Sequence, residues 1–222
     1  MKVAIKKNIL REEDRIGALN RETLRAHGVT AFNLIGSPGS GKTSLIEMAY
    51  RELAGKAAMG VIEGDLASDK DTVRLKSLGM EALQINTGRG CHLSPLMVRD
   101  ALSGIPLDAI DILIIENVGN LVCPVSFDLG EDAKIGLVSV AEGDDKPTKY
   151  PLLFLEAEVV ILNKIDLIPH TDFNRDSFYL GLRAINPTIP VIETSCRTGE
   201  GVVEWGKWLM EKVRFKFCRG EA

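Results

Sequence analysis

The stretch IGSPGSGKTSL, positions 35–45, carries the clearest chemical signal in the sequence. It matches the pattern G-x-x-x-x-G-K-[ST], with Gly36, Gly41, Lys42 and Thr43 at the fixed positions. Glycines let consecutive backbone N–H groups turn toward a phosphate, the lysine bridges the β- and γ-phosphates, and the threonine hydroxyl is a ligand for Mg²⁺. We therefore predict a nucleoside triphosphate site made by Gly36, Ser37, Gly39, Ser40, Gly41, Lys42, Thr43 and Ser44. The alternative is a glycine-rich turn between a strand and a helix that binds nothing.

The motif NKID, which ends at Asp166, indicates which base is bound. Its carboxylate can accept two hydrogen bonds from guanine, from N1–H and from the 2-amino group, whereas adenine has no donor at those positions. Because an unpaired buried carboxylate is penalised, we expect GTP and GDP rather than ATP. Asn163 is expected to contact the base edge and brace the phosphate loop, and the Lys164 stem to cover the ring. Ser195 and Cys196 are expected to cap the base through backbone N–H groups.

Carboxylates at two further strand ends fit a role in hydrolysis. Glu116 ends the run DILIIE and is expected to hold Mg²⁺ together with Thr43, directly or through water. Asp65, in EGDLASDKD, is expected to serve the same ion and to orient the attacking water, whereas Asp69 fits better as a helix cap. With Lys42, these two carboxylates are the predicted catalytic group. The sequence offers neither the water-orienting glutamine of small GTPases nor an evident arginine in cis, so we expect slow turnover, about 10⁻⁴ to 10⁻² s⁻¹.

Cysteine and histidine residues follow two of the predicted strands, 81–86 and 111–117. Cys91 and His92 are adjacent in NTGRGCHL, and Cys123 follows seven residues after Glu116. Thiolate and imidazole are ligands for Zn²⁺, Ni²⁺ or Cu⁺, and three of them leave a four-coordinate site open for a ligand from a second copy or a partner. The alternative is two buried cysteines and a histidine that caps the helix starting near Leu93.

The order of apolar and amphipathic stretches predicts a doubly wound α/β protein of P-loop NTPase fold, with one domain over residues 1–222. Because parallel strands end at one edge of a sheet, the sites above are expected to share it. A charged helix is expected over 8–27, capped by Asn8 and stopped by Gly28. The remaining helices are expected at about 42–54, 69–79, 93–103, 174–185 and 201–215. The strands, mostly apolar on both faces, are expected at 31–36, 59–64, 81–86, 111–117, 134–140, 158–164 and 189–195.

The composition excludes several classes of partner. Hydrophobic residues make up 45% and charged residues 26% of the chain, as in ordinary soluble proteins. The net charge is −4 and no long basic run occurs, so we expect no binding to nucleic acid or to a membrane surface. The chain has neither a signal-peptide pattern nor a membrane-spanning apolar stretch, which predicts a cytoplasmic protein. The cysteines are widely spaced and fit free thiols, with Cys196 and Cys218 assigned no metal.

Together these motifs resemble the HypB family, GTPases that insert nickel during maturation of [NiFe] hydrogenase. The resemblance covers the chain from about Asn8 onward and is carried by GSPGSGKT, EGDLASDKD, NTGRGCHL, ENVGNLVCP, EGDDKPTKYP, NKIDL and ETSCRTGEGV. It implies a GTPase of the signal-recognition and MinD class, which works as a nucleotide-dependent homodimer. It also implies that Cys91, His92 and Cys123 bind nickel or zinc near the dimer interface. The implied partners are the zinc-containing accessory protein HypA and the hydrogenase large-subunit precursor.

The chain departs from many bacterial members of that family at its start. Residues 1–30 contain no cysteine and only His27, so the amino-terminal Cys/His nickel motif is absent from them. The metal chemistry is therefore expected at the cluster of Cys91, His92 and Cys123. We further expect GTP to favour a closed dimer and hydrolysis to loosen the metal site, with Lys146 reaching the phosphates or a partner subunit. A solvated loop is the alternative for the segment EGDDKPTKY that holds Lys146.

Three other functions fit parts of the pattern. A urease-type nickel maturation GTPase combines a phosphate loop with a Cys/His site, but its Cys-Pro-His tripeptide is missing here. A P-loop kinase would use ATP and deliver no metal. A binding module without hydrolysis would keep the nucleotide site and lack phosphate release.

Overall fold

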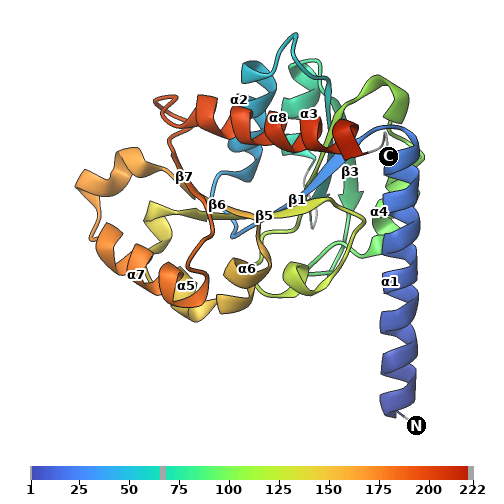
Figure 1. Ribbon diagram of the computed structural model, residues 1–222, viewed down its shortest axis with the longest axis horizontal. Coiled ribbons are helices and arrows are strands. Elements are labelled where there is room, and N and C mark those ends of the chain that lie inside the picture. The colour runs from blue at the N-terminus through green and yellow to red at the C-terminus, as the bar shows by residue number, and fades with distance from the viewer. Residues whose placement is uncertain (1, 66–68, 220–222) are drawn as a thin grey trace.

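A parallel sheet of seven strands forms the centre of the protein (Figure 1). The computed structural model describes the backbone of residues 2–65 and 69–219, and the side chains of residues 11–65 and 69–213. The strand order is β3-β2-β4-β1-β5-β6-β7, and every neighbouring pair is parallel. The strands are β1 Thr30–Gly36, β2 Met59–Asp65, β3 Glu81–Asn86, β4 Ile112–Glu116, β5 Ala133–Ser139, β6 Val159–Asn163 and β7 Val191–Thr194.

Helices cover both faces of the sheet, which confirms the predicted doubly wound architecture. They are α1 Lys2–Ala26, α2 Lys42–Glu52, α3 Lys70–Ser77, α4 Pro95–Leu102, α5 Lys146–Lys149, α6 Pro151–Glu156, α7 Arg175–Ile185 and α8 Val202–Arg219. Short 3₁₀ turns lie at Leu107–Ala109, Cys123–Ser126, Val140–Glu142 and Ile165–His170. In Figure 1, α2, α3 and α8 lie above the sheet and α5, α6 and α7 lie below it.

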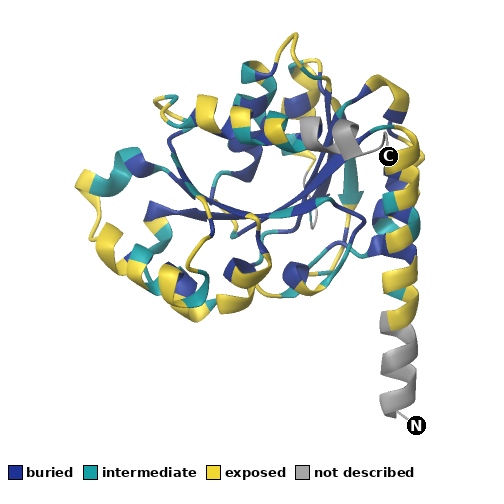
Figure 2. Cartoon of the chain, in the orientation of Figure 1, coloured by how far each residue is buried: buried dark blue, intermediate teal, exposed yellow. Residues whose placement is uncertain are grey.

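Apolar side chains of the strands fill the core on both faces. The inner strands are almost wholly buried and the edge strands β3 and β7 less so, while the helices alternate buried and exposed positions (Figure 2). One core cluster joins the sheet to α2 and α8 around Trp205, and a second joins it to α6 and α7 around Phe154 and Phe178. A third cluster joins α1 and α4 to the sheet through Leu24 and Leu102. Burial on both faces explains why the strands read as continuous apolar runs.

All seven strands predicted from the sequence are present, within two residues of the expected bounds. Helix α1 differs at its start: it begins at Lys2, so Asn8 lies inside the helix and does not cap it. Its end is as predicted, because Gly28 has φ 66 and its N–H donates to the carbonyl of Arg25. The short helices α5 and α6 are not predicted from the sequence. Each has a proline in its first turn, where the missing backbone N–H costs no helical hydrogen bond. Within the described residues, no helix is both long and apolar enough to cross a bilayer.

Candidate nucleotide and metal sites at one edge of the sheet

The phosphate loop connects β1 to α2 and is shaped by two left-handed glycines. Gly39 has φ 75 and Gly41 has φ 101, conformations that a side chain disfavours. The Lys42 ammonium lies 3.3 Å from the carbonyl oxygen of Ser37 and 3.4 Å from that of Gly36. The buried Ser40 hydroxyl donates to the same Ser37 carbonyl at 2.8 Å. The loop is therefore preorganised, with its lysine folded over the concave side that a phosphate would enter.

The end of β6 braces this loop across the sheet. The Asn163 amide donates to the Ser40 carbonyl at 2.9 Å, and the Lys164 ammonium donates to the Gly39 carbonyl at 2.5 Å. A Cβ on Gly41 would overlap the Asn163 amide, so this glycine is required by packing as well as by its backbone angle. The expected bracing by Asn163 is thus present. Its oxygen accepts from Thr194 at 3.1 Å, which leaves this side chain fully engaged with the protein.

A cavity of about 380 Å³ lies between the phosphate loop and the NKID segment. Asp166 lines it, and the Ser195 hydroxyl donates to the Asp166 carboxylate at 2.6 Å. This bond fixes the carboxylate while its other oxygen can accept a hydrogen bond from a base. The other lining residues are Gly41, Ser44, Glu47, Met48, Arg74, Asn163, Lys164, Leu167, Cys196 and Arg197.

The expected cap of the base through the Ser195 N–H is wrong, whereas a cap through the Cys196 N–H stays a prediction. The Ser195 N–H donates to the Glu200 carbonyl at 3.0 Å, so it is not available to cap a base. Ser195 acts instead through its hydroxyl, which orients Asp166. The Cys196 thiol lies 3.6 Å from the Asn163 amide oxygen, and burial raises the pKa of this thiol. A neutral thiol is suited to lining a base pocket and unsuited to binding metal.

Buried carboxylates lie beside the phosphate loop at the ends of β2 and β4. The Thr43 hydroxyl lies 3.2 and 3.4 Å from the two oxygens of Glu116, where a divalent cation would join them. Burial raises the pKa of Glu116 to about 8, while the Lys42 ammonium opposes that rise. Glu63 is its neighbour in the β2–β4 register, and it accepts a hydrogen bond from Thr72.

Glu63 is a site residue that the sequence reasoning missed. Burial raises its pKa, as for Glu116, and the negative charges of Asp71 and Asp65 act in the same direction. The available signal was a glutamate inside the apolar run MGVIEG, since a charged residue in a buried strand needs a partner. Asp65 itself ends β2 directly before residues 66–68, which lie outside the described part of the chain. Asp69 occupies the position before α3 without a hydrogen bond from its side chain to that helix.

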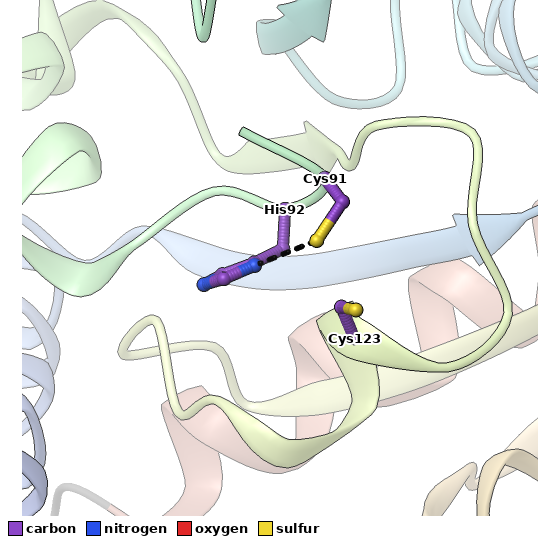
Figure 3. A group of neighbouring side chains, drawn as sticks. All are labelled: Cys91, His92 and Cys123. Carbon is purple, nitrogen blue, oxygen red and sulfur yellow. Dashed lines mark hydrogen bonds between the residues drawn. The ribbon is translucent and has the colours of Figure 1, made fainter. Parts of the chain in front are cut away.

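Cys91, His92 and Cys123 meet at this edge of the sheet (Figure 3). The first two follow β3 and the third follows β4, yet one sulfur or nitrogen atom of each lies within 4.8 Å of the others. Cys91 Sγ is 3.5 Å from His92 Nδ1. The His92 ring stacks on Phe127 with centroids 4.0 Å apart, and burial lowers its pKa. The alternative role of His92 as a helix cap is wrong, because Ser94 caps α4.

The chemistry of this cluster fits a soft or borderline metal ion. A neutral imidazole and two thiols, ionised on binding, suit Ni²⁺ or Zn²⁺ and do not suit Mg²⁺. Ligand atoms about 2.3 Å from one ion lie about 3.8 Å apart at the tetrahedral angle, so the cluster would contract by up to about 1 Å on binding. A hydrogen bond with Cys123 raises the pKa of Cys91, so binding would release a proton.

The fold and the phosphate loop define a P-loop nucleotide-binding protein with a separate Cys/His cluster. The family model "CobW/HypB/UreG, nucleotide-binding domain" matches residues 30–193. The hydrogenase maturation factor HypB of Azotobacter vinelandii is 47% identical over 207 residues, which cover 92% of this chain and 68% of that protein. The chain therefore belongs to the HypB family of hydrogenase maturation factors.

Two solved structures show the same fold over nearly the whole chain. HypB from Helicobacter pylori, crystallised in complex with nickel, has a TM-score of 0.87 and 36% identity, covering 91% of this chain and 95% of that one. A HypB from Archaeoglobus fulgidus has a TM-score of 0.86 and 38% identity, and the match covers 92% of this chain and 100% of that one.

The Lys146 side chain makes its hydrogen bonds within its own segment. Lys146–Lys149 form the short helix α5, and the reach of Lys146 to the phosphates or to a partner subunit stays a prediction, as does its solvated alternative. The Lys146 ammonium donates to the Glu142 carbonyl and lies 3.3 Å from the Asp145 carboxylate. These contacts hold the side chain against its own turn, with 15% of it exposed.

Proposed function

We propose that this protein is a GTP-hydrolysing metallochaperone switch that carries nickel, or zinc, and supports nickel insertion into [NiFe] hydrogenase. The observation that carries the proposal is the placement of two unlike sites on one edge of the sheet. The Thr43–Glu116 pair lies on the nucleotide side, and Cys123 follows Glu116 on the same loop. A change at one site therefore has a covalent path of seven residues to the other.

In the proposed mechanism the nucleotide is held by residues already in position. The loop N–H groups and Lys42 bind the phosphates, and Thr43 with Glu116 holds Mg²⁺. Mg²⁺ supplies the positive charge that stabilises the phosphates during transfer. Asp65 orients the attacking water, and Glu63 supports the site from the neighbouring strand. No arginine is assigned to the phosphates, which accounts for slow intrinsic turnover.

The metal is cargo in this proposal and is bound by Cys91, His92 and Cys123. Three ligands leave a coordination position open, which a second copy of the chain or a partner can fill. We assign the first role to a GTP-favoured homodimer. The accessory protein HypA and the hydrogenase large-subunit precursor are the proposed partners in nickel transfer, and the proposed compartment is the cytoplasm.

The base specificity is tested by comparing GTP with ITP, because inosine lacks only the 2-amino group of guanosine. Loss of one hydrogen bond to the Asp166 carboxylate is expected to cost about 1.5–3 kcal/mol, or about 10- to 150-fold in affinity. In Asp166→Ala the GTP-over-ITP preference is expected to vanish, while Thr171→Ala, an exposed change on the same segment, retains it. Equal binding of GTP and ITP by the unaltered protein would refute the base assignment.

The competing functions predict different results in the same assays. A kinase would prefer ATP in competition, and a binding module without hydrolysis would release no phosphate from GTP over hours. Delivery to urease instead of hydrogenase would show as nickel-dependent activation of urease in a reconstituted extract. The hydrogenase function is favoured here because the Azotobacter vinelandii relative, at 47% identity, is a hydrogenase maturation factor.

A further inference from the structure

Three buried polar side chains form a continuous hydrogen-bonded chain beneath the nucleotide and metal sites. They are Asn117, Asn33 and Glu131, with exposed fractions of 1%, 0% and 7%. Asn117 Nδ2 donates to Asn33 Oδ1 at 3.1 Å, and Asn33 Nδ2 donates to Glu131 Oε1 at 3.3 Å. An apolar side chain would fill either asparagine position without a polar group to satisfy, so two buried asparagines that bond to each other call for another role.

Both ends of the chain attach to the loops that carry the metal ligands. The Leu93 N–H donates to Asn117 Oδ1 at 3.0 Å, and Leu93 directly follows His92. At the other end the Leu129 N–H donates to Glu131 Oε2 at 2.7 Å. Leu129 lies two residues after Phe127, the ring that stacks on His92.

The Asn117 end of the chain also attaches to the nucleotide site. Asn117 directly follows Glu116, the carboxylate that contacts Thr43. Its backbone N–H donates to the Leu34 carbonyl at 3.0 Å, two residues before Gly36 opens the phosphate loop. Asn33 lies in the same central strand, β1. A movement of Glu116 therefore displaces a side chain bonded to the backbone behind His92.

The donors and acceptors of this chain can be paired in only one way. Glu131 accepts at both of its oxygens, Asn33 and Asn117 each accept on one side and donate on the other, and no link can be reversed alone. In a buried site every broken link leaves an unpaired polar group, which is unfavourable because no water replaces the lost partner. Such a network moves as a unit, which is what a connection between two sites needs.

We propose that Asn117, Asn33 and Glu131 are positioning residues that couple the nucleotide state to the affinity of the metal site. The inference rests on the proposed function, since it presumes a nucleotide at Glu116 and a metal at Cys91, His92 and Cys123. It assigns the coupling to this buried chain rather than only to the exposed loop from Glu116 to Cys123.

The test measures Ni²⁺ affinity by competition with a chromophoric chelator, with GDP and with a non-hydrolysable GTP analogue. The unaltered protein is expected to show a ratio of affinities of about 5- to 150-fold between the two states. Glu131→Gln preserves shape but places a donor where the chain needs an acceptor, so one link breaks wherever the amide faces. We expect the ratio to fall to within about twofold of unity, while metal still binds.

Asn20→Ser is the matched control. Asn20 is also a buried asparagine, and its amide donates to the carbonyls of Pro95 at 2.8 Å and Leu129 at 3.0 Å, behind both metal-ligand loops. It has no bond to the proposed chain. Its loss is expected to weaken Ni²⁺ binding by the same factor in both nucleotide states, which leaves their ratio unchanged. A merely structural role for Glu131 would give this same pattern.

Asn117→Ser removes the member of the chain that directly follows Glu116 and serves as the second variant, with folding checked by thermal unfolding. An unaltered ratio in Glu131→Gln and Asn117→Ser, with a large ratio in the unaltered protein, would overturn this inference and leave the proposed function intact. A ratio of unity in the unaltered protein would instead overturn the coupled switch itself. Loss of the ratio in Asn20→Ser as well would also count against a specific path through the chain.

Discussion

Two buried glutamates at the sheet edge have pKa values above those of a glutamate in water. Burial raises the pKa of Glu116 to about 8, and it raises the pKa of Glu63 in the same direction. Both carboxylates lie beside the phosphate loop, where Mg²⁺ would favour their ionised forms. Without nucleotide and metal, the site therefore destabilises the folded chain at neutral pH.

This state of Glu116 predicts a pH dependence of stability in the nucleotide-free protein. A carboxyl whose pKa is higher in the folded state stabilises the fold below its unfolded pKa of about 4.5, and that contribution is lost as the pH rises through about 8. The free energy of unfolding from urea titrations is expected to fall between pH 5 and pH 8. Glu116→Gln is expected to make this fall smaller.

Glu12→Gln is the control for that series. Glu12 is exposed on α1, and a hydrogen bond from Arg15 lowers its pKa, so its substitution is expected to leave the slope above pH 5 unchanged. Parallel curves for Glu116→Gln and the unaltered protein would show that Glu116 is ionised in both states.

The role of a residue could be predicted from the sequence where it belongs to a motif. The role of a buried polar residue could not, because it depends on the neighbours that the fold supplies. Lys42, Thr43 and Asp166 belong to motifs whose spacing is fixed by the ligand, and the structure places them around one loop and one cavity. The proximity of Cys91 to Cys123 followed from the rule that parallel strands end at one edge. Asn33 and Glu131 lie in no motif and Asn117 has no assigned role within ENVGNLVCP, so only the three-dimensional packing shows that they belong together.

At the scale of elements, α1 holds the two loops that carry the metal ligands. It packs on α4, and its Arg21 forms an ion pair with Asp128 at 2.5 Å. Gly17 lies where the helix crosses the backbone of Asp128, and a Cβ there would overlap the Asp128 carbonyl oxygen. The close approach explains a glycine in the interior of a helix.

Gly17→Ala is therefore expected to destabilise the protein despite the higher helix propensity of alanine. Propensity favours alanine by about 1 kcal/mol, while overpacking against backbone costs about 1–3 kcal/mol, so we expect a net loss of about 1 kcal/mol. Thermal or urea unfolding measures it. Ala18→Gly, at the exposed neighbouring position, reports the propensity alone and is expected to cost about 1 kcal/mol. A more stable Gly17→Ala protein would mean that α1 does not approach the Asp128 backbone closely.

The sequence predicted the sheet better than the ends of the helices. Strands buried on both faces produce apolar runs that end where the sheet ends, as in VVILN of β6. Helix α1 was expected to begin at Asn8 because that residue type often caps helices, yet the helix begins at Lys2. A cap residue permits a helix start without requiring one, because tertiary packing and chain context decide the boundary.

For the whole molecule, the central claim is that one edge of a doubly wound sheet holds two sites that sense each other. The phosphate loop follows β1, Glu116 ends the adjacent β4, and Cys123 follows on the same connection. As proposed metal ligands, Cys91, His92 and Cys123 would leave one position for a donor from outside the chain, and a dimer contact beside them would supply it. A closed dimer with GTP and a looser one with GDP would then differ in metal affinity.

Reciprocal titration of the intact protein tests this claim most directly. Ni²⁺ affinity is measured with GDP and with a non-hydrolysable GTP analogue, and the affinities of both nucleotides are measured with and without Ni²⁺. Because coupling is mutual, the account predicts the same factor, about 5- to 150-fold, in both directions, and its disappearance in Cys123→Ala but not in the exposed control Thr171→Ala. Metal affinities that are equal in the two nucleotide states, with both ligands bound, would contradict it.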